Sequence, residues 1–483
     1  MGTVKRDAVH PSAGRDWGLI AAMTVSAHPI AFLFGLALIG VSGFVGDWGL
    51  LAPPVAWTVF GLVGAAVSRH QLPGRAIRPA NEPELAALVQ AVAEQMGFRV
   101  PLLVRVIPVP DAGLIATKVA GVRVFVLVLG WPLLRGLTAA QLAAVVAHEL
   151  AHELHLGDRR TSRLLAARES LVESMDNGVQ VPAAVAGKLL RATQKRSWEF
   201  ETAADASSAD VAGSTAVRGA LEQSGLIMAA FEILGERWAS ALADDGSYPQ
   251  DLYDALDAAM GDAYAGRLVA AAAQAADDAD ELDPYGISSH PPRATRVAAI
   301  PERPEGGWDS REPVPMRDGE AVDRWCVHEL VGPEDPSDEL RPVRVLDCAP
   351  ERFDVPVGEA NAALVEATGC DSVPAAMAAI LEAIADGSWV QLARAIDPDI
   401  RSAPPALRAA LGRDALVGCL GRAVSGRLLD AGWHRSSRWM TSALVNPDGE
   451  DVDVRVLIEQ ALDSADPLTL RELLALGDPR TMA

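Results

Sequence analysis

Two long stretches near the N-terminus carry no acidic or basic side chain other than a histidine. Residues 17–46 contain no Asp, Glu, Lys or Arg, and after Asp47 the chain is again free of charge over residues 48–68. Each stretch can cross a hydrocarbon layer about 30 Å thick, which needs roughly 20 apolar residues. The pattern predicts a transmembrane hairpin over residues 17–69, because the first stretch is too long for a signal peptide and a second follows at once. A hairpin buried in a soluble protein is the alternative.

Basic residues flank the predicted hairpin on both sides, whereas the turn between its spans carries only Asp47. They are Lys5, Arg6, Arg15, Arg69, Arg75 and Arg78. Cytoplasmic loops carry an excess of Lys and Arg, so both flanks are expected in the cytoplasm. The sequence thus predicts a multi-pass protein of the cell membrane with two spans. Residues 1–16 and everything after the hairpin would lie on the cytoplasmic side.

The chain after the hairpin shows mostly helical periodicity. Apolar residues recur at helical spacing over residues 84–96, and runs rich in Val, Leu and Ile predict strands at residues 100–109 and 122–129. Thr138 and Gln141 form a capping box that starts a helix expected to end near Gly157. Further helices are predicted over residues 159–175, 182–210 and 215–242. Residues 73–300 therefore read as a mainly helical α+β domain with a small sheet.

A second domain is predicted at the C-terminal end. Residues 301–315 are rich in Pro, Glu, Gly and Asp, which is typical of a linker. Residues 316–483 alternate helical runs with a hairpin expected around residues 446–449, where Asn-Pro-Asp-Gly supplies turn chemistry. This α+β accessory domain carries no motif that indicates its role.

The amino-acid composition limits the kinds of molecule that the protein is expected to bind. The formal net charge is −22 and the pI is about 4.8, which argues against nucleic acid because the phosphate backbone would be repelled. The four cysteines are scattered and form no C-x-x-C pair, so they indicate no disulfide framework. The sequence says nothing of the oligomeric state.

The strongest chemical signal is the H-E-x-x-H motif formed by His148, Glu149 and His152. Residues four apart on a helix share a face, so both imidazoles can reach one zinc ion. Glu149 lies one step around the helix, where its carboxylate can accept a proton from an attacking water. The motif therefore predicts one zinc ion per subunit, with Glu149 as general base. Two unrelated histidines on a helix surface are the alternative.

A third protein ligand is needed to complete such a site. His155 lies on nearly the same face as His152, but a ligand so close on one helix would have to bend back toward the ion. Glu201 and Asp205, four apart on a predicted helix, are better placed: one carboxylate can bind zinc while the other accepts a hydrogen bond from a ligand histidine. A solvated acidic helix face would give the same spacing.

With these residues in view, the chain resembles the M48 family of metallopeptidases, in particular its HtpX-like and CAAX prenyl protease-like members. Residues 142–152 are similar to the family's zinc-binding helix, the stretch from Glu201 to Asp205 to its E-x-x-A-D element, and the stretch from His290 to Arg296 to its late H-P-P-x-x-x-R element. The resemblance implies that Glu201 is the third zinc ligand. It also implies that His290 helps to stabilise the tetrahedral intermediate and that Arg296 supports the site.

The same resemblance implies a gluzincin fold, in which the edge strand of a small sheet receives the substrate. It implies an endopeptidase that acts on membrane or misfolded proteins, as in membrane-protein quality control. Two departures stand out. Residues 159–195 are too polar for the second pair of spans found in HtpX, and Ala112-Gly113 replaces the Asn-Ala that often precedes the edge strand. Two spans also cannot build the intramembrane chamber that prenyl-protein cleavage requires.

The sequence thus favours a membrane-anchored zinc endopeptidase with protein or peptide substrates. The alternative is a membrane-tethered interaction or regulatory protein whose zincin-like domain is not proteolytic, but the presence of Glu149 argues against it.

Overall fold

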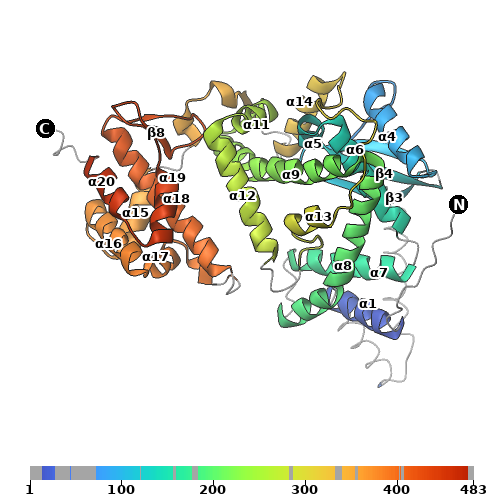
Figure 1. The fold of residues 1–483 in the computed structure, drawn as a ribbon, viewed down its shortest axis with the longest axis horizontal. Coiled ribbons are helices and arrows are strands. Elements are labelled where there is room, and N and C mark those ends of the chain that lie inside the picture. The colour runs from blue at the N-terminus through green and yellow to red at the C-terminus, as the bar shows by residue number, and fades with distance from the viewer. Residues whose placement is uncertain are drawn as a thin grey trace. The chain divides into compact units, whose positions relative to one another are not determined.

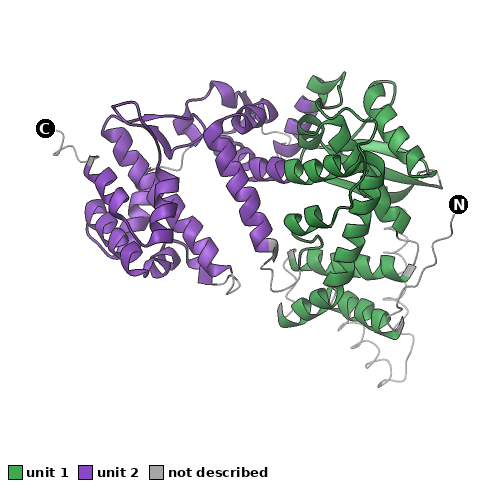
Figure 2. Ribbon diagram, in the orientation of Figure 1, with its two compact units in different colours: residues 1–224, 283–322 green, residues 225–282, 323–483 purple. Residues whose placement is uncertain are grey.

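A computed structural model of the chain describes residues 13–27, 44, 72–119, 121–155, 159–176, 183–281, 287–331, 340–353, 357–401, 403 and 407–476 (Figure 1). The contacts between residues divide the chain into two compact units (Figure 2). Unit 1 consists of residues 1–224 and 283–322, and unit 2 of residues 225–282 and 323–483. The sequence prediction instead placed the first domain at residues 73–300 and the second at 316–483. The difference arises because residues 225–282 group with the later part of the chain, for example through contacts with residues 341–353.

Unit 1 contains a four-stranded sheet in the order β1 (Arg75–Ala76), β2 (Leu102–Ile107), β4 (Val122–Gly130) and β3 (Ala112–Val119). β2 pairs with β4 in parallel, and the other two pairings are antiparallel. β4 is buried from Val124 to Gly130, which explains its nearly continuous run of Val, Leu and Phe. β3 lies at the edge of the sheet, so one side of its backbone has no partner strand among the described residues.

Five described helices of unit 1 match predicted ones closely. They are α4 (Pro83–Gln95), α6 (Ala139–His155), α7 (Arg159–Asp176), α8 (Ala183–Ala212) and the first part of α9 (Ser214–Ala230). Three further helices were not predicted as such: α1 (Ala13–Ala27), α5 (Trp131–Gly136) and α13 (Arg293–Ala299). The capping box at the start of α6 is confirmed. The backbone N–H of Thr138 donates to Gln141 Oε1 (3.0 Å), and the N–H of Gln141 donates to Thr138 Oγ1 (3.3 Å).

The segment predicted as a linker, residues 301–315, is bonded along its length to helix ends of unit 1. The N–H groups of Ala139 and Ala140, at the start of α6, donate to the carbonyls of Glu312 and Asp309. At the end of α8, Gly306 donates its N–H to the carbonyl of Ala212. Helix ends leave unsatisfied backbone groups, and an extended Pro- and Gly-rich strand of chain can supply partners for them. The Pro- and Gly-rich composition that predicts a linker therefore belongs to a segment that caps helices.

Helix α1 includes the first residues of the first predicted membrane span. It packs against α7 and α8 through Met23 and Ala27, and its buried Asp16 forms ion pairs with Arg160 (3.3 Å) and Arg196 (2.9 Å). Apart from Phe44, residues 28–69 of the predicted hairpin lie outside the described residues. Among the helices that are described, no single one is long and apolar enough to cross a membrane. The bent pair α15 and α16 of unit 2 passes that test only when taken together.

Unit 2 begins within α9 and continues through a π-helical turn (Phe231–Gly235) into α10 (Glu236–Ala243). The sequence periodicity predicts one continuous helix over residues 215–242. It does not reveal the π turn, because such a turn inserts a single residue and leaves the apolar pattern on either side of it. The elements that follow are β5 (Ser247–Pro249), α11 (Leu252–Met260), α12 (Ala263–Glu281), α14 (Gly319–Val331), β6 (Arg341–Val343), two 3-10 turns (Val345–Asp347 and Pro350–Phe353), α15 (Val357–Thr368), α16 (Val373–Asp386), α17 (Trp389–Ile396), a 3-10 turn (Pro398–Arg401), α18 (Arg408–Asp430), β7 (His434–Arg435), β8 (Ala443–Val445), β9 (Asp451–Asp453), α19 (Val454–Ser464) and α20 (Leu468–Leu476).

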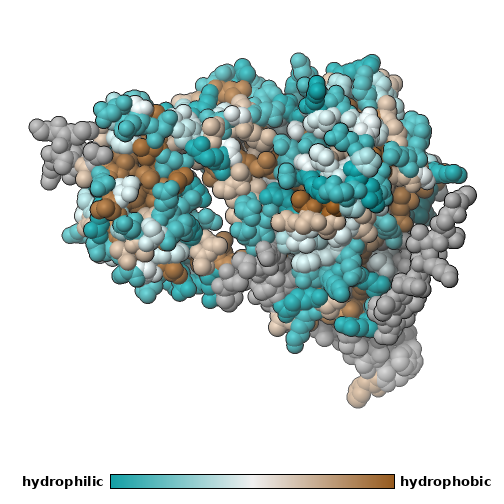
Figure 3. Space-filling view, in the orientation of Figure 1, coloured by the Kyte–Doolittle hydropathy of each residue, from teal (hydrophilic) through white to brown (hydrophobic). Residues whose placement is uncertain are grey.

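Helices α15 to α20 enclose an apolar core that includes Leu364, Ile380, Leu420 and Ile458, each at most 1% exposed. The predicted hairpin is confirmed as the antiparallel pair β8–β9, which turns at Gly449 with φ +88°. On the face seen in Figure 3, hydrophobic residues form small separate patches among hydrophilic ones, as expected from the charged composition.

Candidate metal centre

Two helices of unit 1 build the site. α6, which carries the H-E-x-x-H motif, and α8 pack closely along each other. The buried Ser208 hydroxyl of α8 donates to the carbonyl of Ala144 in α6 (2.6 Å) and fixes their register. This packing brings Glu201 and Asp205 of α8 to His148 and His152 of α6, about fifty residues earlier in the chain.

Three potential ligand groups converge between these helices. The Nε2 atoms of His148 and His152 are 3.0 Å apart, and the Glu201 carboxylate oxygens lie 3.4 Å and 3.5 Å from them. Ligands about 2 Å from a zinc ion at tetrahedral angles are separated by about 3.3 Å, so this donor set fits zinc. Glu149 is close as well, since donor atoms of His148, Glu149 and His152 lie within 4.8 Å of one another.

Asp205 connects the cluster to α13. Its carboxylate lies 2.9 Å from Nδ1 of His148 and accepts two hydrogen bonds from Arg296, at 2.9 Å and 2.7 Å. Burial alone would raise the pKa of Asp205, but Arg296 and His148 outweigh burial and lower it. Asp205 therefore stays charged, leaves Nε2 of His148 directed at the cluster, and orients the ring as partners of ligand histidines do.

The electrostatics of the cluster favour a cation between its carboxylates. Burial alone would lower the pKa of His148, but Asp205 and Glu201 raise it to about 9. Burial and the neighbouring His148 lower the pKa of His152 to about 4, so this ring is neutral, as a metal ligand must be. Burial favours the neutral form of Glu201, yet its contacts with His148 and His290 hold its pKa well below the usual range. A divalent cation bound between these side chains can replace the proton that they share.

Comparison with known families identifies this region. Residues 79–304 match the model for peptidase family M48. That part of the chain is similar to the M48 peptidases. No curated protein and no solved structure shows significant similarity to the chain.

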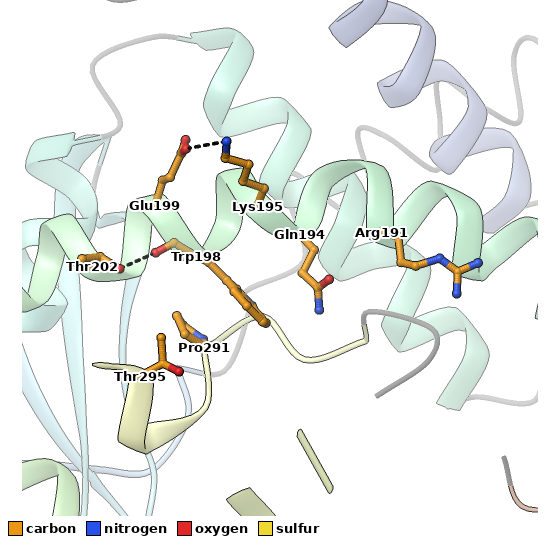
Figure 4. Close-up of a pocket in the computed structure, with 8 residues that line it drawn as sticks. All are labelled: Arg191, Gln194, Lys195, Trp198, Glu199, Thr202, Pro291 and Thr295. Atoms are coloured by element: carbon orange, nitrogen blue, oxygen red, sulfur yellow. Dashed lines mark hydrogen bonds and ion pairs between the residues drawn. The ribbon is translucent and has the colours of Figure 1, made fainter. Parts of the chain in front are cut away.

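His290 of the M48 region lies against the cluster. Its Nδ1 is 2.7 Å from Glu201 Oε2, and its side chain is about half exposed. The following Pro291 is buried, and Figure 4 shows the indole of Trp198 directed toward it from α8. Pro291 and Trp198 line a hollow of about 530 Å³ on this side of α8. The packing holds the His-Pro-Pro segment against the helix that carries Glu201.

Arg168 also holds this segment in place, and sequence reasoning did not single it out. It is 3% exposed and donates to the carbonyls of Leu190, Ile287 and Ser288, at 2.7 Å, 2.9 Å and 2.9 Å. It thus ties α7 and α8 to the two residues that lead toward His290. The signal in the sequence is an arginine between Leu164 and Leu171 on the apolar face of a predicted helix, where a charge needs buried partners. Phe200, whose ring stacks on His152 with centroids 5.2 Å apart, was missed as well.

Three other potential ligands lie near these residues in the sequence, and each has a different partner. Glu153 pairs with Arg123 (2.7 Å), Glu199 with Lys195 (3.9 Å), and Nε2 of His155 lies 2.9 Å from Ser207 Oγ. In Figure 4 Glu199 points toward Lys195, and both line the same hollow as Trp198. The structure therefore brings His148, Glu149, His152, Glu201, Asp205, His290 and Arg296 together, and it does not bring these three competitors to the cluster.

A cleft of about 510 Å³ opens beside the cluster. Leu114 of β3, Leu165 and Val172 of α7, and Phe200 of α8 give it apolar walls. Its polar lining includes Glu149, His152, Glu201 and His290 of the cluster, together with Arg168, Glu169, Glu173, Ser197 and Ser289. Burial raises the pKa of Glu149 to about 7, a value suited to exchanging protons near neutral pH. The cleft can accept an apolar side chain next to groups capable of acid–base chemistry.

Proposed function

We propose that the protein is a zinc-dependent endopeptidase with one zinc ion per subunit, held by His148, His152 and Glu201. The observation that carries the proposal is the meeting of these three groups from two helices at separations that suit zinc ligands. Asp205 and Arg296 support it, since they fix the ring of His148 from behind. Similarity of residues 79–304 to family M48, whose peptidases are typically zinc-dependent, points the same way.

A bound zinc ion would polarise the substrate carbonyl and make water a stronger nucleophile at neutral pH. Glu149, next to His148 and lining the cleft, accepts the proton of the attacking water and passes it to the leaving amine nitrogen. His290 donates a hydrogen bond to the oxygen on which negative charge develops, and its contact with Glu201 holds it near the reacting carbonyl. Arg168 acts through this histidine by fixing the backbone that precedes it.

The substrate in this proposal is an extended polypeptide. β3 is an edge strand, and its Leu114 lines the cleft. An exposed edge offers backbone N–H and C=O groups to an added strand, while a pocket selects a side chain. Since β3 is an eight-residue strand, a peptide bound along it can extend past the reacting bond in both directions. This geometry favours an endopeptidase.

The base is tested by replacing Glu149 with Gln. This variant should bind zinc normally and lose at least about a hundredfold in cleavage of unfolded casein, because the amide cannot take up the proton. Glu153→Gln is the matched control on the same helix, since Glu153 pairs with Arg123. Zinc content and thermal unfolding show whether the variants are intact. Normal turnover by zinc-loaded Glu149→Gln protein would contradict the mechanism. Absence of cleavage by zinc-loaded wild type would favour a regulatory, non-proteolytic protein.

We further propose that the two apolar stretches within residues 17–69 anchor the enzyme in the cell membrane with both flanks in the cytoplasm, where it would act on membrane or misfolded proteins. Missing charge and the basic flanks support this topology. Reporter fusions after Arg78 and after Ala483 should both give a cytoplasmic signal. An extracytoplasmic signal from either would reverse the topology and change the pool of substrates.

A further inference from the structure

Three arginines meet at a small pocket in unit 2, far along the chain from the zinc motif. Arg237 comes from α10, Arg422 from α18 and Arg455 from α19, and together they line a cavity of about 130 Å³. No acidic side chain is among the described residues that line it. The rest of the lining includes Thr441 and Ser442 of the loop before β8. The pocket therefore concentrates positive charge in a chain whose net charge is −22.

The arginines differ in how their charges are balanced. Arg455 pairs with Glu459 (2.8 Å) and Asp414 (3.6 Å), which hold its guanidinium in position. Nη2 of Arg237 donates to the carbonyl of Trp439 at a long 3.5 Å. Nε of Arg422 is buried, and no hydrogen-bond acceptor for it is found in the described part of the chain. A charged side chain with a buried, unpaired N–H group is costly, so an anion in the adjoining pocket would stabilise the charge of Arg422.

Two glycines leave the pocket open. Gly418 and Gly421 of α18 both line it, and a Cβ atom at Gly418 would lie 3.6 Å from Nη1 of Arg422. Any larger side chain at Gly418 would therefore take up space beside this guanidinium. The volume is well below the roughly 300–1,000 Å³ of sites for drug-sized molecules. The space suits one small polar group.

We propose that this pocket binds a single phosphate group. A tetrahedral phosphate presents several strong acceptor oxygens and can take charge-assisted hydrogen bonds from three guanidinium groups at once, whereas a carboxylate matches one guanidinium fork. Arg422 and Arg237 each bring a guanidinium to the pocket, and Arg455 is already oriented by its acidic partners. The proposal concerns unit 2 and does not depend on the peptidase chemistry of unit 1.

The test is calorimetric titration of the full-length protein with inorganic phosphate at constant ionic strength. Wild-type protein should bind one phosphate per chain, and Arg422→Ala should weaken binding at least about tenfold, as expected for loss of a charge-assisted hydrogen bond. Arg422→Lys keeps the charge but loses the planar guanidinium and should also bind more weakly. Arg413→Ala is the control on the same helix, because Arg413 pairs with Asp463 instead of lining the pocket. It should bind like wild type.

Thermal unfolding in sodium chloride identifies any variant that is not folded. If Arg422→Ala does not fold, Arg237→Lys takes its place in the titration. Glycerol 3-phosphate distinguishes the source of the group: tighter binding than inorganic phosphate would indicate a larger phosphomonoester such as a lipid headgroup, and equal binding a free phosphate. Equal affinities in wild type, Arg422→Ala and Arg422→Lys would overturn the proposal. So would acetate binding as tightly as phosphate, or no binding of phosphate by the wild type.

Discussion

The α6–α8 site of unit 1 and the α15–α20 core of unit 2 are both helical, but they are held together in different ways. In the first, buried Glu201 and Asp205 meet histidines and an arginine from distant parts of the chain. In the second, helices meet through apolar side chains such as Ile380 and Leu420. Buried charge is costly unless it is paired, whereas buried apolar area stabilises wherever it fits. The polar cluster therefore indicates selection for chemistry, and the apolar core indicates selection for stability.

The largest expected effect concerns Glu201. Glu201→Ala should lower zinc content strongly and abolish cleavage, because it removes one of three proposed ligands and the partner of His290. Glu199→Ala, two residues earlier on α8, should retain both zinc and activity, since Glu199 pairs with Lys195 on the other side of the helix. Metal analysis after dialysis against a weak chelator measures the difference. Normal zinc in Glu201→Ala protein would move the third ligand elsewhere.

A smaller effect is expected at Asp205. Asp205→Asn should weaken zinc binding by about 10- to 100-fold, because the neutral amide no longer balances Arg296 or fixes the ring of His148. The matched control is Asp210→Asn on the same helix, whose carboxylate is largely exposed and pairs with Arg303. Competition for zinc with a chromophoric chelator gives both affinities. Equal loss in the two variants would indicate a general effect of removing a charge from α8.

The effect of Ile380→Ala should appear in stability and leave the chemistry intact. Truncating this fully buried side chain should cost about 2–5 kcal/mol of unfolding free energy, while turnover per folded molecule stays unchanged. Glu382→Ala, two residues on in the same helix, should change stability by about 0.5 kcal/mol or less, because its side chain is mostly exposed and pairs with Arg471 at the surface. Denaturant unfolding followed by circular dichroism separates the two. A loss of turnover in folded Ile380→Ala protein would couple the core to the site.

Local patterns in the sequence were sufficient to predict α6 and α8, the two helices that carry the proposed zinc ligands. The capping box at Thr138 predicts the start of α6, and the spacing of His148 and His152 predicts their shared face. The four-residue spacing of Glu201 and Asp205 likewise predicts that both face the same way on α8. Each inference uses residues within one or two helical turns, where backbone geometry fixes relative positions.

Contacts between segments that are distant in the sequence could not be predicted from such local patterns. Arg168 is recognisable as a charge on an apolar helix face, but its acceptors are carbonyls more than a hundred residues away as well as nearby ones. Residues 301–315 are recognisable as extended, yet their bonds to α6 and α8 depend on how the helices are packed. The division into two units likewise follows from packing of residues 225–282 with a later part of the chain.

The bonds made by residues 301–315 bear on how small a working peptidase fragment can be. The family match ends at residue 304, but Asp309 and Glu312 supply acceptors for the first N–H groups of the helix that carries the histidines. A fragment cut at the family boundary would keep every proposed zinc ligand and still expose that helix end to water. The functional limit of the catalytic unit is therefore set by backbone bonding, and it lies at least eight residues beyond the limit that homology alone would give.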